Sequence, residues 1–179
     1  MAIANYITRK RQSEIDNLLD EILLVTGRSY PEESVIEIIK SYIPDVSIVE
    51  HDFNGDPNTR GAIFKKSSKF KEPLIVIQKK MPKEVKTFTL AHEFGHYCLG
   101  HVGSANFMID KVKYDGSATM QQEAEAQYFA ASLLMPREKF VKLMNFLSIK
   151  ELAQRFGVSE SAVTVRKAWL DGSGRDKAL

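Results

Sequence analysis

The residues best suited to chemistry lie between His92 and His96, where the chain reads His-Glu-Phe-Gly-His and fits the pattern H-E-x-x-H. On a helix, residues four apart lie on one face, so both imidazoles can bind the same metal ion. Glu93 is rotated by about 100° around the helix from His92. Its carboxylate would flank the ion and take a proton from the water that the ion activates, as in metalloproteases.

The simpler interpretation of this segment is a pair of helix histidines bonded to other protein groups. The flanking residues argue against it because they are apolar and predict a largely buried helix; they are Phe88, Leu90, Ala91, Cys98 and Leu99. Two histidines and a glutamate in such a helix need polar partners, and a bound cation supplies them. A degenerate site that holds no metal is a third interpretation.

A catalytic zinc has three protein ligands and one open position, so a third ligand must come from elsewhere. His101 follows His92 by nine residues, whereas the zincin pattern H-E-x-x-H-x-x-G-x-x-H places its third histidine one residue later. If the helix continued, His101 would also point about 180° away from His92. We therefore expect His101 at the helix end or behind a ligand.

The other candidates for the third ligand are Glu123 and Glu125, on a helix predicted over 121–135. They are two residues apart and face nearly opposite ways, so only one can reach the metal. Glu123 lies on the border of the apolar stripe, and Glu125 lies beside Ser132 on the more polar side. A buried carboxylate needs a cation more than an exposed one does, which favours Glu123, with Glu125 as the alternative. Gln127 follows Glu123 by one turn and could orient a histidine from behind.

Two kinds of apolar pattern predict the elements that must position these residues. Apolar residues at steps of three and four predict helices, over residues 5–26, 31–42, 83–99, 121–135, 136–147, 149–156 and 159–170. Short β-branched and aromatic runs predict strands, over residues 46–53, 61–64 and 74–77. The polar stretch 102–120 is predicted as a connection. Helices, then strands, then helices indicate an α+β domain.

Composition is that of an ordinary globular protein, with 179 residues, 44% hydrophobic and 27% charged. This excludes a disordered chain, a collagen-like fibre and a disulfide-stapled miniprotein, and the single cysteine cannot form an internal bridge. No apolar run approaches the ~20 residues that span a bilayer, and the basic cluster near the N-terminus has no apolar stretch beside it. We therefore expect a cytoplasmic protein with no secretory signal and no membrane contact.

The net charge of +2 excludes a polycation built for nucleic acid, but residues 60–86 hold nine basic and two acidic side chains, a local charge of +7. The favoured interpretation is a solvated sheet edge whose lysines prevent self-association. The alternative is a docking surface for an acidic partner or nucleic acid.

Two blocks of sequence, 89–101 and 123–136, together resemble the ImmA/IrrE family of zincin-like metallopeptidases. The similarity spans about residues 46–170. The resemblance implies a zincin-like core, in which a small three-stranded sheet packs on the H-E-x-x-H helix and a second helix carries the third ligand.

The resemblance also implies roles for individual residues. Zinc would be held by His92, His96 and Glu123. The catalytic base would be Glu93. One residue departs from the family pattern, because Gln127 stands where the family usually has Asn or Asp, and its longer side chain alters the contact behind the ligands.

Members of this family resemble anti-repressors, which cut helix-turn-helix transcriptional repressors of mobile elements or prophages, or act in stress responses. The resemblance therefore implies a zinc-dependent endopeptidase with such a repressor as its protein substrate. Four side chains are candidates to stabilise the oxyanion, and the sequence does not rank them: Tyr97, His101, Tyr114 and Tyr128. The alternative function is a non-proteolytic regulator that binds DNA or a repressor on a zincin scaffold.

The last two helices have the small, glycine and branched spacing of a helix-turn-helix, at Ala153, Gly157 and Val163. In a DNA reader, the final helix would place side chains in the major groove, such as Ser161, Thr164 and Arg166. Direct DNA binding is nevertheless the less favoured interpretation, because Glu160 on the same helix would be repelled by phosphate.

The favoured interpretation of these two helices is a packing or partner-docking module. It would have its own apolar core of Leu152, Phe156, Val163 and Trp169. We expect a metallopeptidase domain over 1–147, a helix-turn-helix-like segment packed on it over 148–171, and a frayed tail over 172–179.

Overall fold

The computed structural model describes residues 6–53, 59–66, 71–102, 107–111 and 120–171, without the side chains of 107–111. The elements in this part of the chain are α1 (Arg9–Thr26), α2 (Val35–Tyr42), β1 (Ser47–His51), β2 (Thr59–Phe64), β3 (Leu74–Gln78), α3 (Lys83–Cys98), β4 (Phe107–Lys111), α4 (Met120–Leu134), α5 (Arg137–Met144), α6 (Ile149–Phe156) and α7 (Glu160–Leu170). The predicted α+β class is confirmed, and each predicted helix and strand has a counterpart.

The strands form one sheet in the order β1-β3-β2-β4. β1 runs parallel to β3, and β2 runs antiparallel to both of its neighbours. The apolar residues of the two central strands face each other across the register, with Ile63 opposite Ile75, and both side chains are fully buried. Their inward side chains form the underside of the sheet, on which a helix can pack.

The fourth strand, β4, lies inside the stretch that the sequence predicts as a polar connection, so the sheet extends beyond the three predicted strands. It pairs with β2, with Ala62 opposite Ile109 and Phe64 opposite Phe107. The apolar run that begins at Phe107 is too short to stand out among polar neighbours. Pairing with the open edge of β2 makes this segment a strand, and that edge exists only in the folded protein.

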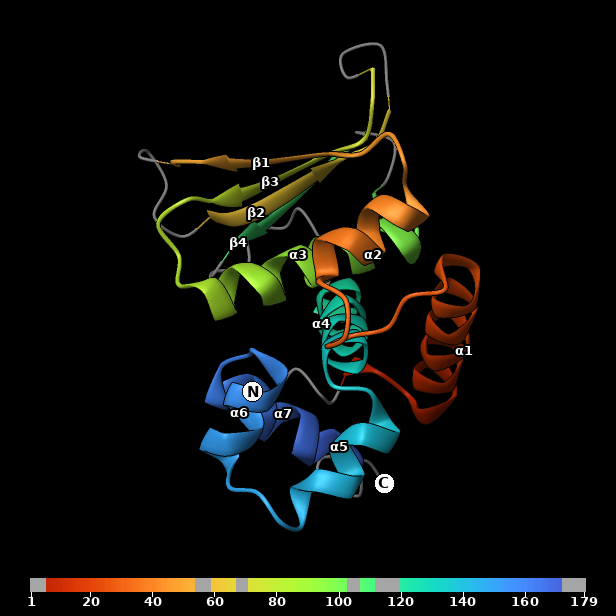
Figure 1. Cartoon of the computed structure of the whole chain (residues 1–179). Helices are drawn as coiled ribbons and strands as arrows, with labels where there is room; N and C mark the ends of the chain where they lie inside the picture. The colour runs from red at the N-terminus through yellow and green to blue at the C-terminus, as the bar shows by residue number, and fades with distance from the viewer. Residues whose placement is uncertain (1–5, 54–58, 67–70, 103–106, 112–119, 172–179) are drawn as a thin grey trace.

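The helix α3 lies between the sheet and α4 (Figure 1), and it contacts β2 and β3 on one side and α4 on the other. Ring contacts fix the crossing of the helices, because Phe94 of α3 packs edge-on against Phe129 of α4, with ring centroids 5.6 Å apart. The ring of Tyr42 of α2 also packs edge-on against Phe94, with centroids 5.6 Å apart. α3 is therefore covered on several sides, which explains why its residues from Thr89 to His96 are buried.

Two helices begin later than their apolar pattern predicts. α2 begins at Val35, because Ser34 and Glu37 form a capping box that satisfies the free backbone N–H groups at the helix start. α1 begins at Arg9, where the side chain of Thr8 accepts a hydrogen bond from the backbone of Arg11. Both helices start where a side chain caps them, and the spacing of apolar residues carries no information about capping.

The two C-terminal helices pack as a module with an apolar core. The four residues predicted for this core are all buried: Leu152, Phe156, Val163 and Trp169. Arg166 is only 1% exposed, and it donates hydrogen bonds to the backbone oxygen of Met135 at 3.1 Å and to Ser132 Oγ at 2.7 Å. Arg166 is therefore turned into the protein, against its place in the less favoured DNA-reading interpretation, whereas Ser161 and Thr164 are exposed. The division of the chain at residue 148 stays a prediction, and the tail 172–179 lies outside the described residues.

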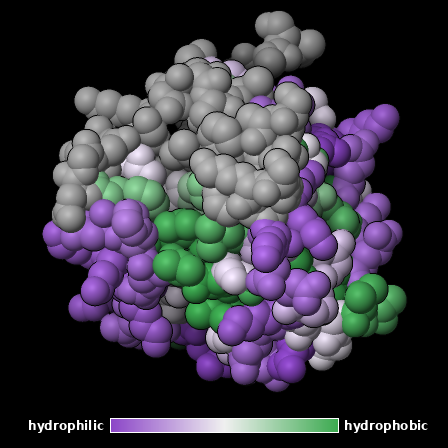
Figure 2. All heavy atoms as spheres, turned by 90° about the horizontal axis from the view of Figure 1, so that it is seen from above, coloured by the Kyte–Doolittle hydropathy of each residue, from purple (hydrophilic) through white to green (hydrophobic). Residues whose placement is uncertain are grey.

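Part of the basic stretch 60–86 is paired with acidic side chains near the edge strand β1. Lys80 forms an ion pair with Asp52 at 2.7 Å, and Lys86 forms one with Glu50 at 2.8 Å. In the view from above, a hydrophobic patch lies between hydrophilic side chains on either side (Figure 2). These pairs agree with the favoured interpretation of a solvated sheet edge.

Within the described part of the chain, every helix is too short or too polar to cross a membrane.

Candidate metal centre

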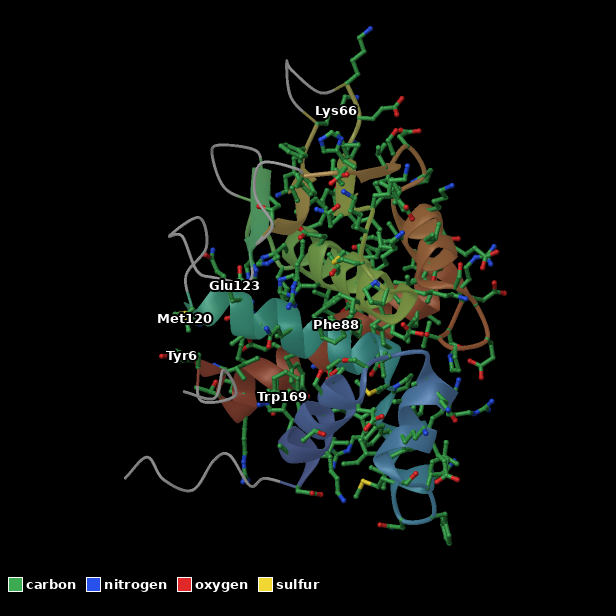
Figure 3. All side chains as sticks on the ribbon, turned by 90° about the vertical axis from the view of Figure 1, so that its left-hand side faces the viewer. Tyr6, Lys66, Phe88, Met120, Glu123 and Trp169 are labelled. Carbon is green, nitrogen blue, oxygen red and sulfur yellow. The ribbon has the colours of Figure 1, made fainter. Side chains whose placement is uncertain are left out.

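Three side chains from two helices converge on one point. The Nε2 atoms of His92 and His96 are 3.0 Å apart. Glu123 Oε2 lies 3.3 Å from His92 Nε2, and Glu123 Oε1 lies 3.4 Å from His96 Nε2. The two histidines come from α3, and Glu123 comes from the first turn of α4 (Figure 3). Within the described residues, these are the His, Cys, Asp and Glu side chains whose ligand atoms lie close enough to share an ion.

The spacing of these atoms fits a tetrahedral metal site. Ligands held at about 2.0–2.1 Å from zinc in a tetrahedron are separated by roughly 3.4 Å, from geometry alone. The measured separations of 3.0, 3.3 and 3.4 Å are close to that value. Two imidazoles and one carboxylate are also the donor set of a zinc site that keeps a fourth position open. The three side chains thus have the donor set and the spacing to hold a metal ion.

The histidines hold Glu123 in its ionised form. Burial would by itself raise the pKa of this carboxyl, but the hydrogen bond from His92 and the proximity of His96 outweigh burial, and the pKa is lowered below its usual range. The side chain of Glu123 is 20% exposed, so one side of the group is open to solvent. An ionised carboxylate beside two buried imidazoles favours a bound cation.

The structure brings Glu123, not Glu125, to the histidines, but the burial argument for this choice is wrong. The side chain of Glu125 is only 5% exposed, less than that of Glu123. Glu125 tolerates burial because Arg11 of α1 donates a hydrogen bond to it at 2.8 Å. Sequence reasoning about α4 alone missed this partner, because nothing in the pattern indicates that α1 packs there.

His101 lies behind His96, where its Nδ1 is 3.0 Å from His96 Nδ1. α3 ends at Cys98, and Gly100 adopts a left-handed conformation with φ of 73°, which turns the chain back. The side chain therefore returns to the side of His96 instead of pointing away, as it would on a continued helix. Burial and the nearby His96 lower the pKa of His101 to about 4, so this imidazole is neutral at pH 7.

Glu93 is fully buried, on the side of α3 that faces strand β2. A Cβ atom at Gly61 would lie only 2.7 Å from Glu93 Oε1, and 2.8 Å from Cγ2 of Thr89. Only glycine therefore lets β2 lie this close to the carboxylate. Sequence reasoning did not single out Gly61, although a lone glycine inside a strand is the signal of such a close approach.

The other predicted site residues have different positions. Tyr128 donates a hydrogen bond from its hydroxyl to Asp16 Oδ2 at 2.9 Å, so this group serves the contact between α4 and α1. Tyr97 is half-buried, and its ring centroid lies 5.7 Å from Lys65 Nζ. Gln127 is partly buried one turn after Glu123, and its role behind the ligands stays a prediction. Tyr114 lies outside the described residues.

Fold and site together define an α+β protein in which two helices under a small sheet carry a group of side chains that could hold a metal ion. The chain belongs to the family described as IrrE N-terminal-like domain (Peptidase_M78), whose model matches residues 43–167. Membership in this family indicates a metallopeptidase or regulator of the IrrE type. None of the curated proteins matches the chain.

Among solved structures, a chain described as a Mycobacterium tuberculosis transcriptional regulator has the same fold, with a TM-score of 0.63 and 15% identity. The match covers 93% of this chain and 50% of that one, so this chain spans about half the length of that neighbour. At this identity the likeness concerns the fold.

Proposed function

We propose that this protein is a zinc-dependent endopeptidase. The observation that carries the proposal is the convergence of His92, His96 and Glu123 at separations that fit tetrahedral zinc. The buried Glu93 stands between the two histidines in sequence and supplies the carboxylate that such a reaction needs. The family match supports the class of activity.

In this proposal His92, His96 and Glu123 hold the ion. When bound, zinc would lower the pKa of water and polarise the scissile carbonyl. Glu93 would accept the proton of the attacking water and pass it to the departing amine, so that one carboxylate serves as base and then as acid. The close approach of β2 to Glu93 at Gly61 would limit the positions that this carboxylate can adopt.

The proposed substrate is a protein, namely a helix-turn-helix transcriptional repressor. The family match and the description of the solved neighbour as a transcriptional regulator both support a regulatory setting. The module of α6 and α7 would then act in packing or in docking the partner, since its Arg166 is turned into the protein.

Substitution of Glu93 by Gln tests the mechanism. We expect the variant to retain zinc, because its ligands are intact, and to lose cleavage by about 10²–10⁴-fold, the usual contribution of a positioned acid–base group. The measurement is incubation of zinc-loaded protein with helix-turn-helix repressors encoded near its gene, followed by mass spectrometry of fragments. The control is Glu84→Gln, which removes an exposed carboxylate from the same helix. Full cleavage by Glu93→Gln would contradict the assignment of Glu93.

The second candidate function is a regulator that binds DNA or a repressor and cleaves nothing. The local charge of +7 over residues 60–86 and the helix-turn-helix-like spacing of residues in α6 and α7 favour it. Titration of duplex DNA at several salt concentrations separates the two functions. A steep salt dependence with sequence preference would favour the regulator, whereas repressor fragments without DNA binding would favour the peptidase.

A further inference from the structure

A chain of polar contacts leads from the metal-binding group to the N-terminal helix. His96 Nδ1 contacts His101 Nδ1 at 3.0 Å, and His101 Nε2 contacts Glu125 Oε2 at 3.2 Å. Arg11 Nη2 donates to the same Glu125 oxygen at 2.8 Å, and Gln121 Nε2 donates to Oε1 at 2.9 Å. Three of these groups are almost fully enclosed: His96, His101 and Glu125.

The chemistry of the donors and acceptors fixes the direction of this chain. Arg11 and Gln121 donate to the two oxygens of Glu125, so the carboxylate accepts and the Nε2 of His101 is the donor in their contact. The two Nδ1 atoms at 3.0 Å then need one donor and one acceptor, and with the proton of His101 on Nε2 the donor is Nδ1–H of His96. The Nε2 atom of His96 is left without a proton. This is the atom that lies 3.0 Å from His92 Nε2 and 3.4 Å from Glu123.

We propose that Arg11, Glu125 and His101 form a supporting chain that fixes the orientation and the tautomer of His96 and thereby strengthens metal binding. The inference deepens the proposed function, because it rests on His96 being a metal ligand. Groups behind a metal-ligating histidine normally set its ring orientation and leave the correct nitrogen free for the ion. Here a second imidazole stands between the ligand and the carboxylate.

Through Arg11, the supporting chain connects α1 to the proposed metal site. The family match begins at residue 43, so α1 lies outside the matched region. Arg11 is also bonded to Glu14 on its own helix, at 3.0 Å, which holds its guanidinium toward Glu125. Arg11, Glu125 and His101 are positioning residues, because they act on the ion only through His96.

The first test measures tautomers in the metal-free protein by imidazole ¹⁵N NMR. We expect the wild type to carry the proton of His96 on Nδ1 and that of His101 on Nε2. In Glu125→Gln, the amide can donate as well as accept, so we expect His96 to become a mixture of tautomers. A wild type with His96 protonated on Nε2 would overturn the supporting chain.

The second test measures the zinc dissociation constant by competition with a chromophoric chelator, together with the visible spectrum of the cobalt-substituted protein. We expect Glu125→Gln and Arg11→Gln to weaken zinc binding by about 10–100-fold, the usual effect of removing a group behind a ligand. We also expect a changed cobalt spectrum, and partial rescue in Arg11→Lys. The control is Lys10→Gln, which removes an exposed basic side chain from the same helix and leaves the chain to His96 intact.

The outcomes separate this inference from the proposed function. Unchanged zinc affinity and an unchanged cobalt spectrum in both Glu125→Gln and Arg11→Gln would overturn the supporting chain and leave the metal site standing. A wild type that binds no zinc but shows the expected tautomers would overturn the proposed metal site, since the NMR measurement needs no metal. If Glu125→Gln does not fold, Arg11→Gln decides, because Arg11 is 34% exposed and its removal leaves no buried gap.

Discussion

Two carboxylates of α4 have different partners in this protein, and the partners determine which carboxylate lies beside the histidines. Glu123 faces the two histidines of α3, and Glu125 faces Arg11 and His101. Both pKa values are lowered against the effect of burial, Glu123 by histidines and Glu125 by Arg11 first. Of the two carboxylates, Glu125 is paired with Arg11, and Glu123 belongs with the histidines to the group that could hold a metal ion.

At the scale of the residue, substitution of Glu123 by Gln is expected to remove zinc more completely than Glu125→Gln does. An amide is a weak ligand and cannot balance the charge of the ion, whereas loss of Glu125 changes only the support of His96. The measurement is the zinc content of each variant after gel filtration with a competing chelator. Equal zinc retention in the two variants would contradict the assignment of Glu123 as a ligand.

At the scale of the element, the position of β2 determines the surroundings of Glu93. β2 lies across α3 so closely that no side chain fits at Gly61. The strand is held there by pairing with β3 on one side and β4 on the other. The close approach at Gly61 thus puts a central strand of the sheet against the proposed base.

The Gly61→Ala substitution tests this contact. The added methyl group would lie 2.7 Å from Glu93 Oε1, so the carboxylate or the strand must shift. We expect zinc to be retained and kcat/KM to fall by about 10²-fold, since a displacement on the order of 1 Å can cost that much. The control is Arg60→Ala, an exposed position on the same strand. Unchanged kcat/KM in Gly61→Ala would show that Glu93 has room to move.

At the scale of the whole molecule, buried polar contacts join helices from both ends of the chain. Tyr128 of α4 donates to Asp16 of α1, and its ring lies 5.7 Å from the guanidinium carbon of Arg166 of α7. Burial raises the pKa of Asp16, although Tyr128 and Arg166 oppose this effect. Trp169 of α7 packs on the same tyrosine ring, with centroids 5.3 Å apart. α4, which carries Glu123, is therefore held by both α1 and α7.

The Arg166→Ala substitution tests the structural role of this arginine. It would leave the Met135 carbonyl and the Ser132 hydroxyl without their buried donor, and we expect the free energy of unfolding to fall by about 2–4 kcal/mol. The measurement is urea unfolding of the metal-free protein, with the exposed Arg155→Ala as the control. Weaker DNA binding at unchanged stability would instead support a nucleic-acid role for α7.

The amino-acid sequence by itself determined the α+β class and the two histidines one turn apart. These features follow from the spacing of residues along single helices and strands, which is a local property. Only the tertiary structure decided that Gly61 lies against Glu93, that β4 completes the sheet and that Arg11 supports His96 through Glu125 and His101. Arg11 and Glu125 are 114 positions apart, and no local periodicity connects them. Their contact exists because α1 and α4 bury apolar faces against each other, which is a property of the whole fold.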